Sequence, residues 1–184
     1  MKTHKTSKAY SVADCQANLS SGLSHLLATY GLALPHEIRD GERWYPDANT
    51  DAVNIASETN IDIDTVIKVA CAISPKCLWK NNMAAAWWTI EWYLSGGFVP
   101  DIADYARGDV YLIRTKNCDT NKPVLAEDPR VKSTPYGGLK ANIIKALWIL
   151  QGHNWVLRGN KVNAFCDNVA NPLTSKLVTV DPHA

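Results

Sequence analysis

Apolar side chains recur along most of the chain at the three- and four-residue spacing of helices, and the alternation typical of strands is scarce. The first such run predicts a helix over residues 12–30, and Gly31 stands where a helix of this length commonly stops. The apolar positions of this predicted helix are Leu19, Leu23, Leu26, Leu27 and Tyr30.

The strongest helix signal is the nearly all-apolar run 65–73, in which Lys68 is the only charge. Asp62 or Asp64 can cap its start, and Pro75 ends it. We therefore expect this helix at the centre of the core. The same periodicity, with Gly96 and Gly97 closing the first segment, predicts further helices over residues 78–94, 139–150, 161–170 and, more weakly, 51–59.

Two segments lack this periodicity. Residues 35–49 are polar and predict turns, and residues 98–138 carry prolines in a long polar stretch that is typical of a functional loop. The pattern as a whole predicts one all-α domain over residues 1–184. Within it, 1–48 form an N-terminal helical extension and 99–137 an irregular insertion.

Charge is distributed unevenly. The net charge of +1 excludes a globally basic protein, and the 46% hydrophobic content excludes a disordered one. However, residues 37–64 hold eight acids and two bases, whereas residues 129–166 hold six bases and no acid. The second segment is equally consistent with a phosphate-binding surface and with an ordinary solvated basic face.

The five cysteines match no metal-ligand spacing, so we expect free thiols, no metal and no cofactor. No secretory signal or membrane-length apolar run occurs, which makes the cytoplasm the expected location. The unusual feature is seven Trp against two Phe, a composition that can serve a core, an interface or base recognition.

Three segments, in order, resemble the helix-hairpin-helix DNA glycosylase superfamily. VIKVACAISPKCLWKNNMAAAWWTI is similar to the buried helix of that family, its turn and the helix after the turn. GGLKANIIKALWIL is similar to the helix before the hairpin, and LRGNKVNAF followed by LVTVDPHA resembles the hairpin and the Val-Asp-x-His segment. The resemblance implies a helical bundle in which residues 138–184 carry the hairpin and the catalytic residues.

By this resemblance the chain would flip out and excise a damaged or modified base, as in DNA repair, with or without AP-lyase activity. Asp181 would stabilise the positive charge on the sugar, and Lys161 would attack C1′. The remaining implied residues bind DNA (Lys76, Arg158, Gly159, Asn160, Lys140, Lys145) or form the base pocket (Trp79, Trp87, Trp88, His183).

Each of these residues also has an ordinary structural interpretation. Lys161 fits an exposed lysine at a helix start, and Asp181 before a proline fits a helix cap. The helical spacing of Trp87, Trp88 and Trp92 favours a place in the core. His153 and His183 are, by general frequency, structural histidines.

The chain departs from the family in two respects. Its hairpin segment is short, and only three residues follow Asp181, where family members continue with further helices. A second protein chain that completes the fold is therefore an expected partner beside DNA. Two alternatives stay open: a transferase like the bacteriophage relatives that act in thymine hypermodification, and a DNA-binding or interaction protein without catalysis.

Overall fold

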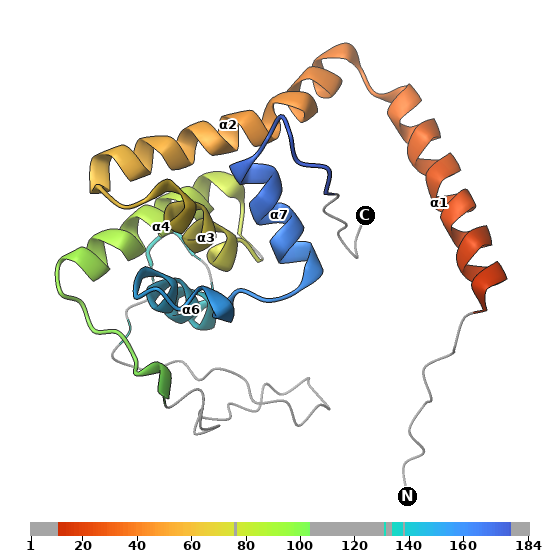
Figure 1. The fold of residues 1–184 in the computed structure, drawn as a ribbon. Helices are drawn as coiled ribbons and strands as arrows, with labels where there is room; N and C mark the ends of the chain where they lie inside the picture. Colours follow the sequence, from red (N-terminus) through yellow and green to blue (C-terminus); the bar gives the residue numbers. More distant parts are fainter. Residues whose placement is uncertain (1–10, 76, 104–130, 132–133, 138, 178–184) are drawn as a thin grey trace, which may run out of the picture. The chain divides into compact units, whose positions relative to one another are not determined.

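The computed structural model describes residues 11–75, 77–103, 131, 134–137 and 139–177, and these residues form helices without a strand. The all-α class predicted from the sequence is thus confirmed for this part of the chain. The bounds of the elements (Figure 1) are α1 (Val12–Leu32), α2 (Pro35–Thr59), α3 (Ile63–Ile73), α4 (Trp79–Leu94), α6 (Lys140–Leu150), the 3-10 turn η1 (Asn154–Val156) and α7 (Asn160–Ala170).

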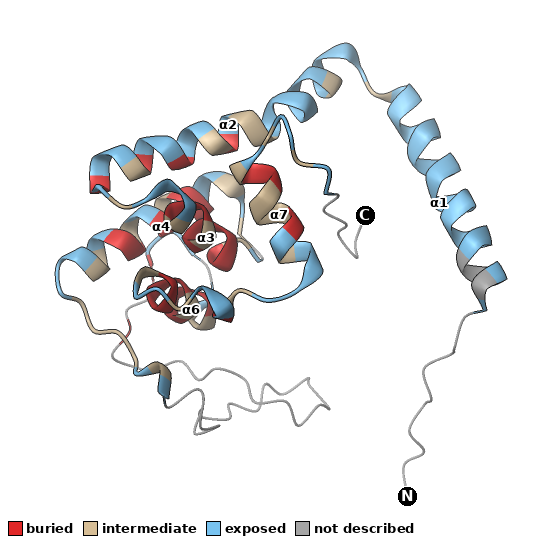
Figure 2. Cartoon of the chain, in the orientation of Figure 1, coloured by how far each residue is buried: buried red, intermediate tan, exposed pale blue. Residues whose placement is uncertain are grey.

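The chain divides into two compact units, residues 1–44 and residues 45–184. In the second unit α3 is the central helix, and it packs against α4, α6 and α7. Seven of its residues, from Val66 to Ile73, are buried, as the apolar run predicts. Asp62 is the N-cap and accepts a hydrogen bond from the backbone N–H of Thr65 at 3.0 Å. Figure 2 shows the buried residues concentrated in α3 and α6.

Polar side chains fix the packing of the outer helices. Asn82 of α4 is fully buried and donates to the carbonyl of Ala70 in α3 at 3.0 Å. Asn49 of α2 donates to the carbonyl of Val169 in α7 at 2.9 Å. Because a buried amide group without a partner is costly, these side-chain bonds restrict how the helices can slide against one another.

The prediction of turns over residues 35–49 is wrong, because α2 runs through this segment without a break. Pro35 occupies the first helical position, where its missing N–H costs nothing, and Glu37 accepts from the backbone N–H of Leu34 at 2.7 Å. Pro46 lies inside the helix, where Thr50 bonds to its carbonyl at 3.0 Å. Polar residues here reflect an exposed helix, since a helix without a buried face shows no apolar period.

Among the described residues no helix is both long and apolar enough to cross a membrane.

Candidate nucleic-acid interface

The segment between α6 and α7 turns sharply at two glycines with positive φ. Gly152 has a φ of 90° and Gly159 a φ of 109°, a region that residues with a Cβ rarely adopt. Gly159 is the N-cap of α7 and supplies no side-chain cap. The first N–H groups of α7 therefore have no capping side chain at this end, a feature that suits an anionic oxygen.

Arg158, directly before this glycine, is held against Trp155. Its guanidinium carbon lies 5.1 Å from the centroid of the indole ring, and its Nε donates to the Trp155 carbonyl at 3.1 Å. Both side chains are exposed, and Trp155 retains 44% of its accessible surface. The cation is thus oriented at the surface before any ligand arrives.

Asn160 and Lys161, both exposed, form the start of α7 beside Gly159. Four predicted DNA-binding and catalytic residues, Arg158 to Lys161, are consecutive in the sequence, and the structure shows all four exposed. Lys140 and Lys145 lie on α6, which packs against η1. Lys145 is half-buried, and this burial lowers the pKa of its ammonium group.

An open surface depression of about 600 Å³, called the cavity below, lies beside the residues that precede η1. Trp148, which is buried in α6, donates from its indole N–H to the Pro100 carbonyl at 2.7 Å and so fixes one wall of the cavity. The cavity is lined by Tyr93, Val99, Pro100, Asp101, Ile102, Gln151 and His153.

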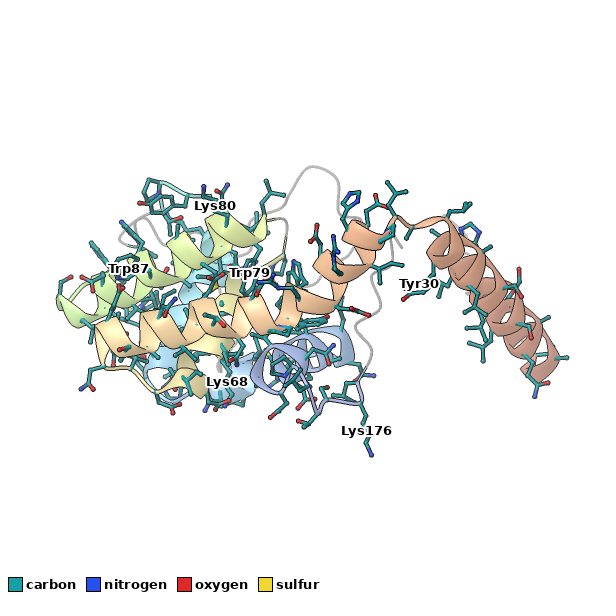
Figure 3. All side chains as sticks on the ribbon, turned by 90° about the horizontal axis from the view of Figure 1, so that it is seen from above. Tyr30, Lys68, Trp79, Lys80, Trp87 and Lys176 are labelled. Atoms are coloured by element: carbon teal, nitrogen blue, oxygen red, sulfur yellow. The ribbon has the colours of Figure 1, made fainter. Side chains whose placement is uncertain are left out.

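The three described tryptophans of the predicted base pocket do not line this cavity. Trp79 is half-buried between α4 and α2 (Figure 3), where its indole N–H donates to Asp51 at 3.0 Å and its ring meets the Phe165 ring edge-on at 6.1 Å. Trp88 stacks on Trp92 at 5.8 Å, and Trp87 is 44% exposed on α4. Trp79 and Trp88 thus have structural partners and are half-buried, whereas Trp87 is exposed.

Three predicted site residues, Lys76, Asp181 and His183, lie outside the described residues. Among the residues that the structure does describe, no cluster of His, Cys, Asp or Glu could hold a metal ion. Cys71 of α3 lies beside Cys166 of α7 as a free thiol. Burial raises the pKa of the Cys71 thiol well above its usual value, and Cys166 raises it further, which makes this thiol a poor nucleophile.

The family model described as "Family of unknown function (DUF7178)" matches residues 8–108, just over half of the chain. The chain belongs to this family. No curated protein and no solved structure matches it. The DUF7178 segment contains α1 to α4 and contributes Tyr93 and the Val99–Ile102 wall to the cavity, whereas the cationic segment and α6 lie after it.

The cavity residues of the DUF7178 segment could not be predicted from the sequence, because Tyr93 and Asp101 have no motif around them. His153, expected from the sequence to be structural, is one of the residues that line the cavity. One feature of the sequence does point to this site: Gln151 and His153 lie within residues 129–166, which contain no acid, and between the end of α6 and the start of η1. Polar residues in a short connection between two well-packed helices are frequent site residues.

Proposed function

We propose that this member of the DUF7178 family binds DNA through residues 155–161 and excises a base that enters the adjoining cavity. The observation that carries the proposal is continuity along the chain. Gln151 and His153 line the cavity, and the exposed Trp155–Arg158 pair and Lys161 follow in the same connection. The proposed base-binding and phosphate-binding surfaces would therefore lie within eleven residues of the chain, 151–161.

The phosphate contact rests on cations and backbone groups. Arg158, preordered on Trp155, presents a planar donor that suits phosphate, and the uncapped N-terminus of α7 adds N–H donors. Such contacts position a protein on DNA without reading its sequence.

The cavity supports the base-binding part of the proposal. An enzyme that acts on a base in a duplex takes that base out of the stack, at a cost of a few kcal/mol. Tyr93 offers a ring to stack on, and the amide of Gln151 offers a donor and an acceptor to a base edge. His153 and Asp101 add further polar groups.

In the proposed chemical step, Lys161 and Asp181 have the roles that the resemblance implies. The Lys161 amine would attack C1′ while the bond to the base breaks, and the base would leave with the bonding electron pair and take up a proton. The resulting adduct can open to a Schiff base between Lys161 and the sugar. Asp181 would stabilise the positive charge that develops on the sugar.

An abasic-site duplex tests this proposal without knowledge of the target base. We expect the protein to form a borohydride-trapped covalent adduct with this DNA, and the Lys161→Ala variant to bind the DNA but form none. Lys68→Ala is the matched control, because Lys68 is already paired with Asp64 on α3. Binding without an adduct in the wild type, together with no base release, would instead favour the non-catalytic DNA-binding alternative.

A further inference from the structure

Two free thiols meet where α3 packs against α7. Cys71 of α3 is 1% exposed, and its thiol lies within hydrogen-bonding reach of the Cys166 thiol on α7. Both helices belong to the unit of residues 45–184, and Figure 1 shows them next to each other. A lone buried cysteine behaves as a small apolar residue, whereas two thiols in contact can also be joined by a disulfide.

Contacts on both sides of Cys166 hold α7 in this position. The ring of the preceding residue, Phe165, lies 6.1 Å from the Trp79 ring of α4. Three residues after Cys166, the Val169 carbonyl accepts a hydrogen bond from Asn49 of α2 at 2.9 Å. Because α7 is fixed against the other helices, the two thiols stay together in the folded protein, and this proximity favours a reaction between them.

The two thiols differ in their access to solvent. Cys71 is almost fully enclosed, whereas Cys166 is half-buried, so an oxidant dissolved in water reaches Cys166 first. Burial also raises the pKa of the Cys71 thiol, which makes Cys71 unsuited to attack an external oxidant. An accessible cysteine beside a second cysteine that can resolve its oxidised form is the usual arrangement of a redox-sensitive pair.

Cys77, in the turn between α3 and α4, provides a comparison within the same unit. It is half-buried like Cys166, and its backbone N–H donates to the Ser74 carbonyl at 3.1 Å. Burial raises the pKa of its thiol, without the contribution from a second cysteine that Cys71 has. Cys77 thus resembles Cys166 in its access to solvent but not in its surroundings.

We propose that hydrogen peroxide converts Cys71 and Cys166 into a disulfide that links α7 covalently to α3. The Cys166 sulfur attacks one peroxide oxygen, the O–O bond breaks, and the released hydroxide takes up the thiol proton and leaves as water. The Cys71 sulfur then attacks the sulfur of the resulting sulfenic acid. The S–O bond breaks, and hydroxide leaves with the Cys71 proton as a second water. The two thiols together lose two electrons, and these reduce the peroxide to two waters.

The disulfide makes the stability of the fold depend on oxidation. Residues 71 and 166 are 95 residues apart in the sequence, and a cross-link of this span restricts the unfolded chain strongly. We therefore expect the Tm of the oxidised chain to exceed that of the reduced chain by about 5–15 °C. Reduction with dithiothreitol should reverse this rise.

Peptide mass spectrometry on the full chain tests the proposal. The protein is treated with dilute hydrogen peroxide, its remaining thiols are blocked with iodoacetamide, and it is digested with trypsin without reduction. Trypsin places the three cysteines on separate peptides, because Lys76 lies between Cys71 and Cys77 and Lys161 precedes Cys166. The expected product is residues 69–76 linked to residues 162–176, lighter than the two free peptides together by two hydrogen atoms.

Cys77→Ala is the matched control and is expected to form the same link with the same rise in Tm. Cys71→Ala should form no link and should leave Cys166 as a sulfenic acid, which dimedone captures. The result for the wild type decides the question without any variant. A wild type whose Cys71 stays reduced while Cys166 is oxidised further, or whose disulfide contains Cys77, would overturn the proposal. Equal Tm values for the linked and the reduced chain would overturn the expected stabilisation.

Discussion

Replacing Trp148 by Phe tests how the cavity wall is held to the core. The Trp148 side chain is 2% exposed, and its indole N–H donates to the Pro100 carbonyl at 2.7 Å. Phe removes this donor and part of the ring volume. The loss of the partner of the partly buried Pro100 carbonyl costs up to about 1–3 kcal/mol, and the space left in the core adds to this. We therefore expect a loss of about 2–4 kcal/mol in the free energy of unfolding.

Thermal unfolding followed by circular dichroism measures this loss. In a domain of 150–250 residues each kcal/mol shifts the Tm by about 2–4 °C, so the Tm of Trp148→Phe should fall by about 4–16 °C. Trp87→Phe is the control, because Trp87 is 44% exposed and should change stability by no more than about 0.5 kcal/mol. Equal Tm values for the two variants would refute the idea that Trp148 anchors the Val99–Ile102 wall.

Three further predictions address packing, titration and DNA binding. Gly97→Ala should destabilise the protein by about 1–3 kcal/mol in urea unfolding, because a Cβ there would lie 2.3 Å from the Trp92 ring. Lys145→Met should raise the Tm at pH 7, because burial lowers the pKa of Lys145 below its unfolded value and the folded protein therefore disfavours the charge. The stability of the wild type relative to Lys145→Met should rise as the pH rises from the lowered pKa toward the ordinary lysine pKa. A stability difference that does not change with pH would contradict this cause. Arg158→Ala should make the slope of log binding constant against log salt shallower by about 0.9 in fluorescence anisotropy with duplex DNA, and an unchanged slope would remove Arg158 from the interface.

The helices of the core could be predicted closely from the sequence. The apolar periodicity places α3, α4, α6 and α7 within two residues of their observed ends. These helices bury one face or most of their surface against neighbours, so the core requirement appears directly in the spacing of apolar residues. The N-terminal half of α2 escapes the same reasoning, because an exposed helix has no core face to impose a period.

The candidate site could be predicted only in part. The segment from Arg158 to Lys161 is visible in the sequence, because its residues are adjacent and include Gly159, which is typical of a turn. The cavity is not visible, because Tyr93 and Asp101 lie in one part of the chain and His153 in another, and they meet only through the packing of α4 and α6. Trp79, predicted from its residue type to lie in the base pocket, has its indole N–H bonded to Asp51, a contact that the sequence does not reveal.

Base release from DNA tests the central claim most directly. Genomic DNA is incubated with the wild type and with Asp181→Asn, and free bases are quantified by mass spectrometry. We expect the wild type to release one kind of base, and Asp181→Asn to release it about 10²–10³-fold more slowly, the usual effect of removing one group that stabilises developing charge. No release by the wild type, or equal release by both proteins, would contradict base excision by this protein.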